Sequence, residues 1–125
     1  MLMYPKNKGV FRFWKALIFS LKGMRYCFHS EAAMREYTTI FLISLPFVFI
    51  LGESPVERII LIGVGVLVLI IEHLNSAIEA TLDRISTDHH DLTGAAKDMG
   101  SAAVFLATML FLYTWVEFIY RHYSA

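Results

Sequence analysis

The stretch VLIIEHLNSAIEATLDRI, residues 68–85, begins as an apolar run and then acquires carboxylates and an amide at helical spacing. On a helical wheel of about 100° per residue, Asn75, Ser76, Glu79 and Asp83 all lie within about 60° of Glu72. Glu72 lies roughly 21 Å along such a helix from Arg58, and Glu79 roughly 31 Å, at about 1.5 Å per residue. The pattern therefore predicts a polar stripe on a helix that is leaving a membrane.

Length and composition predict one small all-α integral membrane domain covering residues 1–125. Of the 125 residues, 57% are hydrophobic, which is high for a soluble protein. No Asp, Glu, Lys or Arg interrupts residues 37–52, 59–71 or 99–116. Because about 20 residues are needed to cross ~30 Å of hydrocarbon, we extend these segments into their flanks and predict spans of about 31–51, 56–85 and 96–120.

A further helix is predicted before the first span, over about residues 8–29. Its apolar residues recur every three or four positions: Val10, Trp14, Leu17, Leu21, Met24 and Phe28. Basic residues fall on the other side of the same wheel: Lys8, Arg12, Lys15 and Lys22. This pattern is typical of an amphipathic helix lying on a membrane surface, and the alternative is a helix packed on a protein core. Ser30 is the predicted N-cap of the first span. Ser54 is that of the second, after a tight turn at Gly52, with Pro55 at the first helical position and Glu57 completing a capping box. Thr93 or Asp91 is that of the third.

The positive charge is distributed unevenly along the chain. Seven of the 11 Lys and Arg residues precede residue 36, and Arg84 and Lys97 flank the second connection, whereas only Arg58 and Arg121 fall on the other side. By the positive-inside tendency, the N-terminus and the 84–97 connection are cytoplasmic. Because this distribution accounts for the basic residues, we expect no nucleic acid partner.

The acidic stripe is the strongest candidate for a functional site. A carboxylate at membrane depth costs about 2.5–3.5 kcal/mol on insertion scales, so such groups face a bundle interior and are functional by default. Their excess of negative charge suggests a divalent ion, and oxygen ligands suit Mg²⁺. Glu31 could complete this site, and the predicted helix start near Gly94 with Lys97 could bind phosphate. The alternative is a polar seam that only holds helices together.

Two segments, EHLNSAIEATLD (residues 72–83) and KDMGSAAV (97–104), resemble one family. With the flanking SEAAMRE and DLTGAAKDMGSAA they are similar to the small bacterial integral-membrane diacylglycerol kinases, in their Gram-negative form rather than the related undecaprenol kinases. The resemblance implies a homotrimer in the bacterial inner membrane, with cytoplasmic active sites between neighbouring subunits. It also implies transfer of the γ-phosphoryl group of MgATP to the primary hydroxyl of diacylglycerol, which yields phosphatidic acid and ADP.

The resemblance also implies roles for individual residues. Glu72 matches the catalytic base, and Glu31 and Glu79 match the carboxylates that hold Mg²⁺. The expected ATP-binding residues are Arg12, Phe19, Glu31, Glu79, Asp83, Asp88, His89, His90, Lys97 and Asp98. The expected lipid-binding residues are Arg12, Ser20, Arg25, Glu36, Asn75 and Ser101. The chain departs from the family pattern at three positions, which are Phe19 in place of tyrosine, Tyr37 in place of an acid and His73 in place of an aliphatic residue.

Three other functions remain open from the sequence. The lipid acceptor could be undecaprenol or another polyisoprenol, because lipid choice depends on groove shape. A transporter or channel subunit could use the acidic stripe as an ion path. A purely structural membrane module would need neither ATP nor a lipid alcohol.

Overall fold

The computed structural model describes residues 9–124, which form four helices and contain no strand. Helix α1 covers Val10–Ser30, α2 Ala32–Leu51, α3 Pro55–Ile85 and α4 Asp91–Ser124. The predicted all-α fold is confirmed, with one helix preceding three apolar ones. The predicted start of the first helix at residue 8 lies outside the described residues.

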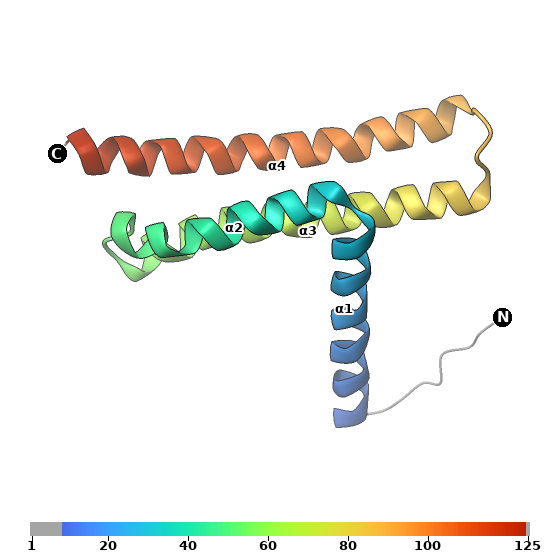
Figure 1. Cartoon of the computed structure of the whole chain (residues 1–125), viewed down its shortest axis with the longest axis horizontal. Helices are drawn as coiled ribbons and strands as arrows, with labels where there is room; N and C mark the ends of the chain where they lie inside the picture. Colours follow the sequence, from blue (N-terminus) through green and yellow to red (C-terminus); the bar gives the residue numbers. More distant parts are fainter. Residues whose placement is uncertain (1–8, 125) are drawn as a thin grey trace.

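Helices α2, α3 and α4 lie side by side, and α1 projects crosswise from the start of α2 (Figure 1). Helices α2, α3 and α4 are each long and apolar enough to cross a membrane, so the chain is a multi-pass membrane protein. Helices α3 and α4 run antiparallel and extend beyond the start of α2, which is shorter (Figure 1). The acidic half of α3 therefore lies where α1, α2 and α3 meet.

The turn between α2 and α3 forms largely as its sequence predicts. The Ser54 hydroxyl caps α3 by accepting a hydrogen bond from Glu57 N at 3.2 Å, and Pro55 opens the helix. The Glu57 carboxylate accepts from the Glu53 amide at 2.7 Å and also interacts with the Ser54 backbone, so the capping box extends to the residue before the cap. A β-carbon on Gly52 would lie 2.8 Å from Val48 O and 2.7 Å from Arg58 Cγ, so this tight turn requires glycine for space.

The predicted cap of the first span is wrong. Ser30 is not a cap but the last residue of α1, and α2 begins after the extended Glu31, whose side chain makes no capping bond. The Arg35 guanidinium donates hydrogen bonds to the carbonyls of Phe28 and His29, each at 2.9 Å. These bonds give partners to two carbonyls at the C-terminal end of α1 that have none within the helix.

Helix α4 covers Asp91–Ser124, so it contains the predicted span of about 96–120 and begins at one of the two residues expected near its start. An acidic residue in the first turn suits the positive end of the helix dipole. The Gly94 amide already donates to His90 O at 3.0 Å, so the small residues before position 96 belong to the helix.

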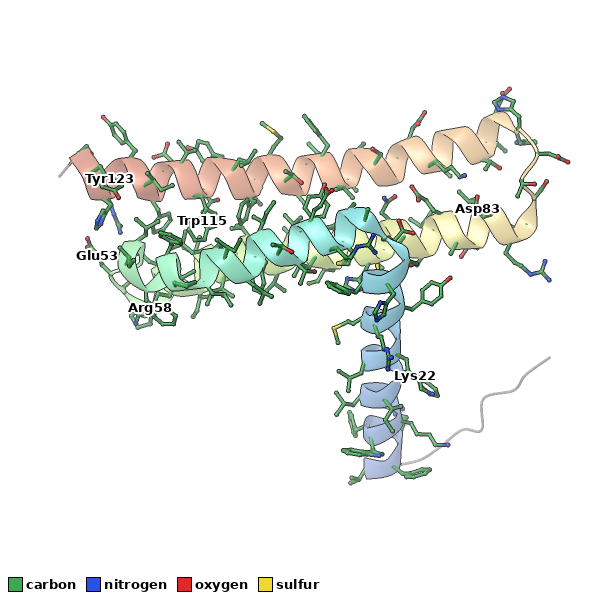
Figure 2. All side chains as sticks on the ribbon, viewed as in Figure 1. Lys22, Glu53, Arg58, Asp83, Trp115 and Tyr123 are labelled. Atoms are coloured by element: carbon green, nitrogen blue, oxygen red, sulfur yellow. The ribbon has the colours of Figure 1, made fainter. Side chains whose placement is uncertain are left out.

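The hydrophobic core lies at the α2–α3 turn. Val48, Leu51, Leu61 and Trp115 pack together there, and Figure 2 shows Trp115 between α4 and the other two helices. At the same end, Arg121 of α4 binds the Glu57 carboxylate and donates to Leu51 O at 3.0 Å. These contacts fix α4 against α3 at the end opposite the acidic stripe.

Candidate functional site

An open cleft of about 660 Å³ separates α1 from the second half of α3. Helix α1 contributes Gly23, Tyr26, Cys27 and Ser30, the junction contributes Glu31, and α3 contributes His73, Ser76, Ala77, Glu79, Ala80 and Asp83. The cleft therefore brings together three of the predicted site residues, Glu31, Glu79 and Asp83.

Glu72 lies next to this cleft but does not line it. Its side chain is 4% exposed, which makes it the one buried charged residue among residues 9–124. Glu72 continues the buried face of α3, which also carries Leu61, Gly65 and Val68. Glu31 and Glu79 are close enough for their charges to act on it. The stripe thus places one carboxylate inside the helix packing and the next two at the cleft.

Asn75 lies where α3 and α4 approach each other. Its Oδ1 atom is buried without a hydrogen-bond partner among the described residues. A β-carbon on Gly100 of α4 would collide with this same oxygen. Gly100 therefore permits the close helix contact that holds the amide in place.

Lys97 reaches the cleft through an ion pair with Asp83. Its Nζ atom is 2.9 Å from Asp83 Oδ1, and Asp83 lies near the end of α3 on the side of α4 (Figure 2). Because Asp83 also lines the cleft, this pair places the Lys97 ammonium at the rim of the acidic site.

The other predicted residues do not line the cleft of this chain. Arg12, Phe19 and Ser20 lie on the projecting part of α1 (Figure 1), where the Ser20 hydroxyl donates to Ala16 O at 2.8 Å. Lys22 Nζ lies 5.9 Å from the centre of the Phe19 ring. The remaining residues are exposed outside the cleft lining: Arg25, Glu36, Asp88, His89, His90, Asp98 and Ser101.

Sequence reasoning expected other residues of α1 at the site and missed those that line the cleft. Gly23, Cys27 and Ser30 recur every three or four residues, so a wheel of α1 continued to Glu31 could have found this face. Burial raises the pKa of the Cys27 thiol, a hydrogen bond with the Ser76 side chain offsets part of this rise, and the nearby charges of Glu31 and Glu72 add to it. The thiol is therefore neutral near pH 7.

The cleft has the chemistry of a site for a magnesium–phosphate ligand. No group of three or more His, Cys, Asp or Glu side chains that could hold a metal occurs in the described part of the chain. Mg²⁺, however, is usually held by one or two carboxylates together with water and substrate phosphates. Glu31 and Glu79, which face the same cleft, fit that requirement.

Comparisons with known proteins show the family of this chain. Residues 18–119 match the family model for prokaryotic diacylglycerol kinase. The diacylglycerol kinase of Escherichia coli (strain K12) is 41% identical over 122 residues, covering 98% of this chain and 100% of that protein. The diacylglycerol kinase of Pseudomonas aeruginosa PAO1 is 43% identical over 116 residues, covering 93% and 94%. That of Haemophilus influenzae Rd is 39% identical over 110 residues, covering 88% and 93%. With its three apolar helices and acidic cleft, the chain belongs to the prokaryotic diacylglycerol kinase family.

Proposed function

We propose that this chain, an ATP-dependent diacylglycerol kinase by its family, transfers the γ-phosphoryl group of ATP to the primary hydroxyl of diacylglycerol at the α1–α3 cleft. Phosphatidic acid and ADP are the products. The observation that carries the proposal is the joint placement of Glu31, Glu79 and Asp83 on one cleft, beside the buried Glu72. Phosphoryl transfer depends mainly on positioning and charge stabilisation, so this arrangement suffices without a glycine-rich nucleotide loop.

On the nucleotide side, Glu31 and Glu79 would hold Mg²⁺, which when bound compensates the negative charge of the phosphates. Lys97, held at the rim by Asp83 at 2.9 Å, offers its ammonium to the same phosphates. The first turn of α4 adds backbone N–H groups and the positive end of a helix dipole. These groups orient the γ-phosphoryl toward the membrane side of the cleft.

On the lipid side, Glu72 is the base. The hydroxyl oxygen bonds to the γ-phosphorus as the bond from that phosphorus to the bridging oxygen of ADP breaks, and the hydroxyl proton passes to the Glu72 carboxylate. Glu72 lies on a spanning helix beside the cleft, at a depth that a lipid hydroxyl can occupy without leaving the bilayer. Positioned proton transfer of this kind contributes about 10²–10⁴-fold to rate.

We further propose a homotrimer in the bacterial inner membrane, with the N-terminus and the cleft on the cytoplasmic side and α1 on the membrane surface. The apolar residues of α1 are exposed, Trp14 by 60% and Leu21 by 55%, which supports contact with lipid. Asp98 and Ser101 of α4 are exposed outside the cleft of their own chain. A neighbouring copy could supply such residues, and the remaining predicted ATP and lipid contacts on α1 and the α3–α4 loop, to a shared site.

The test of the proposed function uses the purified protein in lipid bicelles with γ-labelled ATP and Mg²⁺. The lipid panel contains diacylglycerol, undecaprenol and ceramide, and label is expected in phosphatidic acid. Glu72→Gln should lower kcat by about 10² or more, whereas Glu117→Gln, a matched change at an exposed acid of α4, should not. Near-normal turnover of Glu72→Gln would exclude the base, and label only in the undecaprenol product would exclude the acceptor.

Subunit mixing tests the shared site. Glu79→Gln and Asp98→Asn are each expected to be inactive, and trimers reassembled from a mixture of the two should regain activity because some sites then contain neither change. Chemical cross-linking should yield a three-chain product. Mixed oligomers without recovered activity would show that each site lies within one chain.

A further inference from the structure

The corner between α1 and α2 is one residue long. Glu31 alone separates Ser30, the last residue of α1, from Ala32, the first residue of α2, and its backbone is extended, with φ −117° and ψ 117°. At this residue the chain turns from the projecting α1 into the bundle (Figure 1). The direction in which the Glu31 carboxylate points therefore depends on how the two helix ends are held together.

Arg35 holds the end of α1 from the first turn of α2. Its Nη1 atom donates to the carbonyls of Phe28 and His29, each over 2.9 Å. Both carbonyls belong to the last turn of α1, where the negative end of the helix dipole favours a positive charge. One guanidinium thus ties two successive residues of α1 to α2 and restricts the angle between the two helices.

A second contact holds the same turn of α1 against α3. Cys27 is buried, and its side chain is hydrogen-bonded to the side chain of Ser76. Cys27 O also accepts a hydrogen bond from the Glu31 amide at 2.9 Å. The last turn of α1 is therefore attached to α3 through Cys27 and to α2 through Arg35, and Glu31 follows directly from this doubly held turn.

The contacts of Arg35 also leave the Glu31 carboxylate free. Arg35 is the Lys or Arg residue closest to Glu31 in sequence, and residues four apart within one helix are neighbours. Glu31, however, precedes α2 with an extended backbone, and the Arg35 guanidinium is bound to the carbonyls of α1. Glu31 forms no ion pair with any of residues 9–124, so its carboxylate, which lines the cleft, is available to a cation.

We propose that Arg35 is a positioning residue for magnesium binding, which fixes the α1–α2 corner and so keeps the Glu31 carboxylate on the same cleft as Glu79. The inference rests on the proposed role of Glu31 as a Mg²⁺ ligand. Arg35 acts through the backbone of α1 and touches neither the ion nor the phosphates. Replacing a residue that orients a metal ligand typically lowers metal affinity or activity by about 10–100-fold.

The test replaces Arg35 with methionine, which keeps a long unbranched side chain but has no N–H donor. Arg58→Met is the matched control, because Arg58 Nη1 also donates to a carbonyl at a helix end, that of Gly52 at 3.2 Å, but at the far end of α2. Each full-length variant is assayed in bicelles with ATP and diacylglycerol over a range of Mg²⁺ concentrations. Binding of Mn²⁺ in the presence of ADP is measured separately, from the EPR signal of the free ion.

Arg35→Met should raise the Mg²⁺ concentration needed for half-maximal activity by about tenfold or more and should weaken Mn²⁺ binding, with KM for diacylglycerol unchanged. Loss of a nearby cation would by itself strengthen cation binding, so weaker Mn²⁺ binding reports the geometry rather than the charge. Arg35→Lys should retain most of the affinity, because an ammonium carries three donors for the same carbonyls. Arg58→Met should keep the wild-type Mg²⁺ dependence. If Arg35→Met does not fold, Arg35→Gln, which is too short to reach both carbonyls, carries the same expectation.

Combination with Glu31→Gln shows whether Arg35 acts through Glu31. Once that ligand is lost, Arg35→Met should weaken Mn²⁺ binding no further, because the two changes remove the same interaction. Wild-type Mn²⁺ binding in Arg35→Met, an equal shift in Arg58→Met, or a full additional loss in the double variant would overturn the inference while leaving the proposed function standing. Absence of transfer to diacylglycerol by the wild type would overturn the proposed function, on which the inference rests.

Discussion

Replacing Gly65 with alanine tests the packing that holds α3 against α2 and α4. A β-carbon at this position would lie 2.7 Å from Phe41 Cδ2 and 3.0 Å from Phe41 Cε2, whereas ordinary contacts begin at 3.4 Å. The Phe41 ring must therefore move by about 0.7 Å, the difference between the first and last of these distances. Gly63, two residues earlier on the same helix, is exposed and has no atom within 4 Å of its added β-carbon, so Gly63→Ala is the matched control.

The expected magnitude follows from two opposing terms. Displacing packed side chains costs about 1–3 kcal/mol, although the cavity of about 120 Å³ that Gly65 and Phe41 both line gives the ring some room to move. Alanine gains about 0.8–1 kcal/mol over glycine in a helix. Gly63→Ala receives the gain alone, whereas Gly65→Ala receives both terms. Gly65→Ala should therefore be less stable than Gly63→Ala by about 1–3 kcal/mol.

The assay is unfolding in mixed micelles with a rising fraction of SDS, followed by tryptophan fluorescence, since Trp115 lies in the adjoining core. The free energy of unfolding is compared between the two variants rather than with the wild type, so that the helix-propensity gain cancels. Equal stability of the two variants, or greater stability of Gly65→Ala, would refute the proposed close contact between Gly65 and Phe41.

Three further predictions concern the site and the opposite end of the molecule. Gly100→Ala should displace Asn75, because the added β-carbon would meet its Oδ1 atom. The variant should lose kcat while its thermal stability changes little, and an unchanged kcat would contradict this contact. Glu79→Ala should raise the Mg²⁺ concentration needed for half-maximal activity or abolish activity, and an unchanged Mg²⁺ dependence would count against its ligand role. Arg121→Gln should loosen the end of α4 because it removes the two-point contact with Glu57. A double-mutant cycle with Glu57→Gln should give a favourable coupling energy, and additive effects would show that the pair is not coupled.

The sequence by itself determined the helices and their approximate ends. Apolar runs, the period of the acidic stripe and the Ser54–Pro55 start signal are local properties, so they predicted α3 almost to the residue. Helix starts failed where the signal was not local. Ser30 is of a residue type typical of N-caps, but it is the last residue of α1 rather than the cap of α2. The carbonyls at that end of α1 accept hydrogen bonds from Arg35 at 2.9 Å.

The stripe on α3 was predicted to share one face, yet only the tertiary structure separated its members by environment. Glu72 is enclosed by helix packing, whereas Glu79 and Asp83 face the α1–α3 cleft, because α1 leaves the bundle crosswise at Glu31 (Figure 1). No periodicity within one helix can report the direction of another.

The same reason explains the residues that sequence reasoning missed. Gly23, Cys27 and Ser30 acquire their place at the cleft only from the packing of α1 on α3. A helical wheel gives the face on which a side chain lies, but the burial and the unpaired state of its atoms depend on what the other helices bring to that face. The fold and the identity of the candidate acids therefore came from the sequence, and the division of those acids between packing interior and open cleft came from the structure.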